Sequence, residues 1–207
     1  VIGHFGSLST TRNLTCIIGA LEMLQIQRPE MIAQTELHLY GGPLDAVSSN
    51  KIAASLVHAQ VKHFGRIEAD SKSGLSGREQ ILQRMRSADV LLLLHGEDPI
   101  CEEYIPSKLY EYLWMQRPIL ATVHRNPQMA QMLREQGHVA VLTGGNGSGA
   151  HSTVEELYRE VVRLFQLWQT GKLPDTGRIS PYTTQDAVGK LISWTHLPSK
   201  NLEKTHP

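Results

Sequence analysis

The chain has 207 residues, of which 41% are hydrophobic, and this is enough for one large α/β domain or at most two small ones. Its 20 lysine and arginine residues balance 20 aspartate and glutamate residues, which excludes the basic surface that nucleic-acid binding requires and a polybasic membrane patch. No apolar run approaches the roughly 18 residues of a membrane-spanning helix, and no signal peptide is visible.

In chain order, short apolar runs alternate with stretches of helical periodicity. The predicted strands are residues 1–5, 36–40, 61–64, 90–94, 119–123 and 139–142. The predicted helices are residues 14–24, 77–88, 107–115, 128–136, 153–170 and 184–195, with 49–57 as a weaker candidate. The run DVLLLL, residues 89–94, is apolar on both faces, as expected of a strand buried between two helix layers.

This alternation predicts an α/β fold, a Rossmann-like doubly wound parallel sheet of about six strands. Such sheets bind ligands beyond the carboxyl ends of their strands, at the point where the strand order reverses. Residues 1–175 are predicted to form this domain, and residues 176–207 a linker and a last helix. The chain opens at Val1 inside a strand-like run, so we expect a fragment that lacks an N-terminal partner domain.

The ten histidines are scattered, and no H-x-x-x-H or C-x-x-C spacing predicts a structural metal site. Asp98 and Glu97 are a weak candidate pair for a metal. Cys16 and Cys101 lie far apart in sequence and are interpreted as free thiols in a reducing cytosol.

The main candidate functional residues lie in residues 96–123, GEDPICEEYIPSKLYEYLWMQRPILATV. Pro106 disfavours helix at Ile105 and suits a first helical turn, so a helix is predicted to begin at Pro106 or Ser107. The unpaired N–H groups and the positive dipole end of that helix form an anion site, and Lys108 adds a cation beside it. Diphosphate is the natural occupant.

Two carboxylates flank this predicted anion site. Glu111 lies one turn inside the helix and reaches back toward its start, where it can accept the two adjacent hydroxyls of a ribose. Glu103 precedes the helix, on the side where a sugar would hang. The alternative is structural: a glutamate near a helix start is favoured by the dipole alone, and Glu111 would then be a solvated residue.

The E-x7-E spacing of Glu103 and Glu111, followed by YLWMQRPILATV, resembles the donor-binding signature of retaining GT-B glycosyltransferases of the family-four type. The form IPSKLYEYL…RPIL resembles bacterial members that build surface polysaccharides. In that family a glycine-rich turn after the first strand carries an Arg and then a Lys that hold the phosphates. Here the turn reads GHFGSLSTTRNL, with Ser7 in place of the Arg and Arg12 in place of the Lys.

The resemblance implies site residues across the domain. Arg12, Lys108 and Glu103 are the expected catalytic residues, with Glu102 as the alternative first glutamate because the turn reads CEEYIP. The expected donor-binding residues are Glu111, Ser107, Pro106, Ile105, Gly6, Ser7, Arg66, Ile67 and His95, with base contacts from the backbone of residues 65–67.

Two of these assignments have structural alternatives. Gly6 either permits close approach of a phosphate or is an ordinary turn glycine. His95 either lines the donor pocket or is a structural histidine with satisfied hydrogen bonds. Leu113 and most of the aromatic residues around Glu111, namely Tyr110, Tyr112 and Trp114, are interpreted as packing residues.

The expected activity is transfer of a hexose-type sugar from a UDP- or GDP-type nucleotide sugar to a saccharide or lipid-linked acceptor. The resemblance implies retention, with the leaving diphosphate helping to take the acceptor proton, and no cofactor or metal. The partners are the donor and the missing acceptor-binding domain, in the cytoplasm or at the inner face of the membrane. A sugar-nucleotide 2-epimerase and a non-catalytic binding module are the alternatives.

The last predicted helix carries an apolar stripe of Ala187, Val188, Leu191, Ile192 and Trp194. In GT-B enzymes this helix packs on the N-terminal domain. We therefore expect residues 179–194 to be poorly anchored in this chain, and the fragment to self-associate through the exposed stripe.

Overall fold

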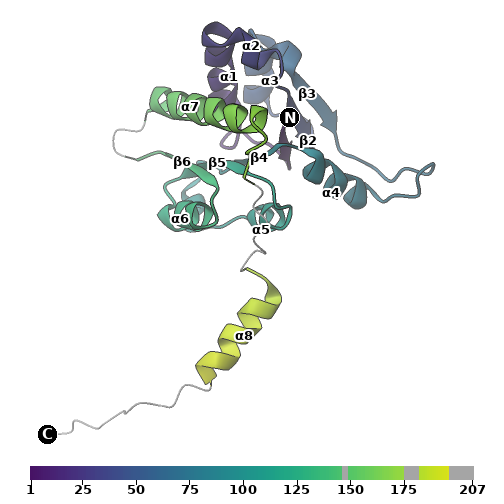
Figure 1. Ribbon diagram of the computed structural model, residues 1–207, viewed down its shortest axis with the longest axis vertical. Coiled ribbons are helices and arrows are strands. Elements are labelled where there is room, and N and C mark those ends of the chain that lie inside the picture. The colour runs from purple at the N-terminus through teal and green to yellow at the C-terminus, as the bar shows by residue number, and fades with distance from the viewer. Residues whose placement is uncertain (146–148, 175–181, 196–207) are drawn as a thin grey trace, which may run out of the picture.

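A computed structural model describes residues 1–145, 149–174 and 182–195. Within them six parallel strands form one sheet in the order β3-β2-β1-β4-β5-β6 (Figure 1). The strands are β1 Ile2–Phe5, β2 Leu37–Tyr40, β3 Val61–Gly65, β4 Val90–Leu94, β5 Ile119–His124 and β6 Val139–Thr143. The predicted doubly wound sheet and its six strands are confirmed, and the order reverses between β1 and β4.

The helices follow the predicted order with a few shifts at their ends. They are α1 Thr15–Gln27, α2 Pro29–Ile32, α3 Ala46–Ala53, α4 Gly77–Ser87, α5 Ser107–Trp114, α6 Pro127–Glu135, α7 Ala150–Gln169 and α8 Thr184–Thr195. The weak candidate at 49–57 is wrong in its bounds, because Asp45 accepts a hydrogen bond from the Ser48 N–H and starts α3 earlier. The short helix α2 was not predicted.

Two apolar clusters lie on the two faces of the sheet. On one face α1 and α7 pack together against Ile2, Leu92 and Leu94. On the other, α4, α5 and α6 pack against Phe5, Leu91 and Leu93 (Figure 1). Every residue of β4 is buried, which confirms the prediction of a strand between two helix layers.

The strands β1 and β4 separate at the switch point. They pair only at Ile2–Val90 and Gly3–Leu91. Beyond this point Tyr112, from α5, fills the gap: its hydroxyl accepts the Phe5 N–H at 2.9 Å and lies 3.3 Å from the Leu92 carbonyl. Burial raises the pKa of Tyr112 far above its ordinary value. This hydroxyl therefore ties α5 to the end of β1.

The interpretation of the α5 aromatic residues as packing residues holds for only part of the set. Tyr112 and Leu113 are buried, but the Trp114 side chain is 64% exposed. The two side chains differ because α5 is a short amphipathic helix, and residues two apart in a helix, such as Tyr112 and Trp114, point to different sides. Tyr110 is also exposed and contacts the ring of Tyr182, with centroids 6.0 Å apart.

The helix α8 stands apart from the sheet, beyond α5 (Figure 1). Its apolar residues Val188, Leu191 and Ile192 are exposed. Residues 175–181, residues 196–207 and the side chain of Trp194 lie outside the described residues. The division at residue 175, the weak anchoring of residues 179–194 and self-association stay predictions.

Candidate functional site

Segments that follow β1 and β4 meet at the carboxyl edge of the sheet. The Thr11 hydroxyl donates to the Asp98 carboxylate at 2.7 Å, and the Glu97 N–H donates to the Thr11 carbonyl at 3.0 Å. The turn after β1 closes on itself through two backbone hydrogen bonds between Ser9 and Arg12. These contacts fix both segments beside the gap between β1 and β4, where a doubly wound sheet places its ligand.

The helix α5 begins at Ser107 with Pro106 as its N-cap, as predicted. Pro106 is buried and has an extended backbone, and no side chain accepts a hydrogen bond from the first turn. Ser107 is exposed, and Lys108 is partly exposed beside it. The N–H groups of Ser107 and Lys108 have no hydrogen-bond acceptor among the described residues, so this helix start can receive an anion at the carboxyl edge of the sheet.

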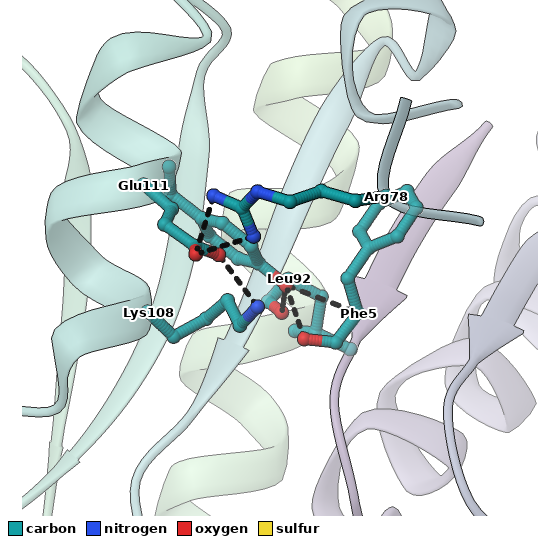
Figure 2. Close-up of polar contacts among 6 residues, drawn as sticks. Phe5, Arg78, Leu92, Lys108 and Glu111 are labelled. Atoms are coloured by element: carbon teal, nitrogen blue, oxygen red, sulfur yellow. Dashed lines mark hydrogen bonds and ion pairs between the residues drawn. The ribbon is translucent and has the colours of Figure 1, made fainter. Parts of the chain in front are cut away.

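Glu111 lies between two cations (Figure 2). Its Oε2 accepts from Lys108 Nζ at 2.6 Å, and its Oε1 lies 3.3 Å from both Nη1 and Nη2 of Arg78. Burial acts to raise the pKa of Glu111, but the Lys108 hydrogen bond and charge, followed by those of Arg78, leave it below the ordinary value. Glu111 is thus an ionised acceptor next to the open end of α5.

Arg78, from the first turn of α4, was missed by the sequence analysis. The signal was present: Ser76 and Glu79 form a capping box, with each side chain accepting from the other residue's backbone N–H. This pattern marks the start of a helix that follows the third strand. Its first turn faces the same edge of the sheet as the start of α5, so a side chain there reaches the site.

A cavity of about 420 Å³ lies between α4 and α5, above the ends of β1 and β2. It brings together the predicted residues Gly6, Arg66, Ile67 and Lys108. The rest of its lining is Phe5, Tyr40, Gly41, Gly77, Arg78 and Ile81. A larger hollow of about 590 Å³ near Trp114 and Arg117 lies at the amino ends of the strands, where parallel sheets do not place ligands.

Arg12 and Lys108 converge on the end of β1 around His4. Burial is the main cause that lowers the pKa of His4 to about 4, and the charges of Arg12 and Lys108 add to it. His4 Nδ1 donates to the Leu92 carbonyl at 3.1 Å, which leaves Nε2 as a buried acceptor without a partner among the described residues. Arg12 Nε is likewise buried and has no partner there. The two predicted phosphate-binding cations are therefore close to the same strand end.

The glycine turn after β1 is shaped by a close approach of two loops. Gly6 has φ +152°, and a Cβ at Gly41 would meet the Gly6 carbonyl oxygen of the neighbouring loop. A Cβ at Gly6 itself would point into open space beside the cavity. Ser7, the next residue, is exposed. Backbone conformation by itself thus favours glycine at position 6, and close approach of a phosphate there stays a prediction.

The two neighbouring glutamates differ in their contacts. Glu102 Oε1 accepts from Arg125 Nη1 at 3.2 Å, and Arg125 Nε also donates to the Gly144 carbonyl. Glu103 is exposed, and its carboxylate makes no hydrogen bond or ion pair with the residues that the structure describes. Of the two candidates for the first glutamate of the motif, Glu103 is the one available to a ligand.

Both ring nitrogens of His95 bind backbone groups. Nδ1 accepts the His124 N–H at 3.2 Å, so Nε2 carries the proton and donates to the Tyr104 carbonyl at 3.1 Å. Burial is the main cause that lowers the pKa of this imidazole. These bonds support the structural alternative for His95, and donor contact stays a prediction. Ile105 packs against the cluster under α4, α5 and α6.

Comparison with solved structures identifies the fold. The C-terminal domain of the glycosyl transferase group 1 family protein LpcC from Francisella tularensis matches with a TM-score of 0.55 and 13% identity, over 84% of this chain and 79% of that one. The chain has the fold of the C-terminal half of a GT-B glycosyltransferase. No protein-family model and no curated protein matches the sequence.

Two longer enzymes share this fold. WaaG, a glycosyltransferase involved in lipopolysaccharide biosynthesis, matches 93% of the chain with a TM-score of 0.55 and 16% identity. The pneumococcal O-GlcNAc transferase GtfA, solved with UDP and GlcNAc, matches 93% with a TM-score of 0.57 and 15% identity. The chain spans 47% of the length of WaaG and 34% of that of GtfA.

Among the described residues, no helix has the length and apolar character needed to cross a membrane. These residues also contain no group of three or more His, Cys, Asp or Glu side chains placed to hold a metal ion. Cys16 and Cys101 are free thiols, as predicted.

Proposed function

We propose that this chain is the donor-binding domain of a retaining glycosyltransferase, which transfers a sugar from a nucleoside diphosphate sugar to a saccharide or lipid-linked acceptor. One observation carries the proposal: Arg78 and Lys108 line a cavity at the switch-point edge of the sheet, and both hold an ionised Glu111 beside the start of α5. The fold, and the UDP bound to GtfA, support a nucleotide as the ligand. We place the enzyme in the cytoplasm or at the inner membrane face.

Each part of the nucleotide has a matching group in this proposal. The base lies against the backbone of residues 65–67, and Glu111 accepts the ribose hydroxyls. The diphosphate lies at the start of α5 between Lys108 and Arg12, which stabilise the charge that develops when it leaves. Glu103, which is exposed and has no ion pair among the described residues, orients the donor sugar.

Thermal denaturation with UDP, GDP, ADP and their sugars tests the proposal. A specific diphosphate at about 100 times its Kd should stabilise the protein by about 2.7 kcal/mol, a rise in Tm of roughly 5–10 °C. The rise in Tm should grow with nucleotide concentration. Inorganic sulfate, added to supply the same amount of negative charge, should not produce the same rise. Equal Tm values with and without each nucleotide at millimolar concentration would overturn the proposal.

A second experiment addresses the reaction class. The longest available form of the protein is incubated with radiolabelled nucleotide sugars and its products are separated. Label transferred to an acceptor supports a glycosyltransferase, whereas an isomerised nucleotide sugar would identify an epimerase. Binding without any product, in a form that also contains an acceptor-binding domain, would favour a non-catalytic module.

A further inference from the structure

Arg78 lies at an electrostatically unfavourable position in its own helix. It is the second residue of α4, where the partial positive charge of the helix start disfavours a cation. The capping box of Ser76 and Glu79 already completes this helix end without Arg78. The described partner of its guanidinium is Glu111, 33 residues away on α5. The contact therefore serves the site and not the helix that carries Arg78.

The two cations hold different oxygens of the same carboxylate (Figure 2). Lys108 binds Oε2 from within α5, and Arg78 binds Oε1 from α4 across the cavity. Oε2 accepts one donor and keeps a lone pair. At Oε1 both 3.3 Å contacts come from one guanidinium and so from one side, which leaves the other side of this oxygen with a lone pair for a further donor. Two adjacent hydroxyls need two such lone pairs, one on each oxygen, in a fixed orientation.

We propose that Arg78 is a positioning residue that orients Glu111 for a ribose and so sets the preference for ribose over 2′-deoxyribose. This rests on the proposed function. Without Arg78, Oε1 would have no fixed direction, because Lys108 holds only the other oxygen. The carboxylate would then have to be ordered when the nucleotide binds, which costs affinity.

The test compares pairs of ligands that differ in one hydroxyl: UDP with 2′-deoxy-UDP, and GDP with 2′-deoxy-GDP. Calorimetry gives the ratio of the two Kd values for the wild type, Arg78→Ala, Arg78→Lys and the control Arg86→Ala. Arg86 lies at the far end of α4, away from this cavity. Arg78→Ala should reduce the ribose preference by about fivefold, the effect of one net hydrogen bond. Arg78→Lys should restore part of it, and Arg86→Ala should leave it unchanged.

A double-mutant cycle separates positioning from a direct contact with the nucleotide. In a Glu111→Gln background, Arg78→Ala should have no further effect on the ratio, because there is no carboxylate left to orient. A ratio that is unchanged or increased in Arg78→Ala overturns the inference while nucleotide binding itself still supports the proposed function. If the wild type binds none of the four nucleotides, the proposed function fails, and the inference fails with it.

Discussion

The two helix layers differ in how completely they close over the sheet. On the α1–α7 face, α1 buries four aliphatic side chains, Ile17, Ile18, Leu21 and Leu24. The two helices also approach closely at Gly19, where an added Cβ would lie 3.1 Å from the Val154 side chain of α7. On the opposite face, Met85 is the buried residue of α4, and a cavity of about 420 Å³ separates α4 from α5 above the ends of β1 and β2. One layer is sealed, and the other opens at one end.

The difference separates the face of the sheet that supplies stability from the face that carries the proposed binding site. Close aliphatic packing on the α1–α7 face leaves a hollow of only about 40 Å³ beside α7, too small for a nucleotide, and supplies much of the buried apolar area. The open end of the other face carries Arg78, Lys108 and Glu111, whose charges stay partly exposed. A rigid layer can thus hold the strand ends steady while the opposite layer presents polar groups to a ligand.

The largest effect is expected from the sealed face. Leu21→Ala should lower the free energy of unfolding by about 2–5 kcal/mol, because it leaves a cavity among fully buried residues. Urea denaturation measures this loss. The Kd for UDP or GDP, measured below the unfolding range, should stay within about twofold of the wild type, since additivity holds for distant sites. A large change in nucleotide affinity would show that the two faces are coupled.

Two buried histidines have a pKa lowered to about 4 by burial: His4 on β1, and His138, which follows α6. In the unfolded chain both titrate near pH 6.5, so below that pH the unfolded state binds more protons. Stability should fall as the pH drops from 6.5 to 4, by on the order of 3 kcal/mol per histidine.

Denaturation at several pH values, with His4→Gln and His138→Gln, measures the two contributions. Each variant should lose part of the acid dependence. A bound diphosphate should weaken only the His4 contribution, because Arg12 and Lys108 lower the pKa of His4 and the anion offsets their charge. An equal effect of diphosphate on both variants would contradict the placement of the anion beside β1.

Glu111→Ala should weaken binding of a nucleoside diphosphate by about 10–100-fold, as expected when hydrogen bonds to a charged group are lost. Glu103→Ala should change it little, because the donor sugar that Glu103 is proposed to orient is absent from the diphosphate. Calorimetry with both the diphosphate and the nucleotide sugar separates the two roles. Similar losses for the diphosphate in both variants would refute this division.

The smallest effect is expected from the hydroxyl that joins the open layer to the sheet. Tyr112→Phe keeps the ring but leaves the buried Phe5 N–H without its acceptor, which should cost about 1–3 kcal/mol of unfolding free energy. Hydrogen exchange of the Phe5 amide should accelerate more than that of the Leu93 amide in β4. Unchanged protection at Phe5 would mean that the hydroxyl is not what holds this strand end.

The sequence by itself determined the elements and their class. Apolar runs such as the one in β4 and helix periodicities such as that of α1 depend on neighbours a few residues away, so they predict strands, helices and a doubly wound sheet. Pro106 likewise predicted the start of α5 from local geometry alone. The E-x7-E spacing placed Glu103 and Glu111 before and inside that helix.

Only the tertiary structure decided which side chains meet. Arg78 contacts Glu111 across 33 residues, and Tyr112 reaches Phe5 across 107. These pairs depend on how each crossover sets its helix over the sheet, and no local pattern encodes that distance or rotation. The same holds for His95, whose two ring nitrogens bind backbone groups that only the folded chain brings together.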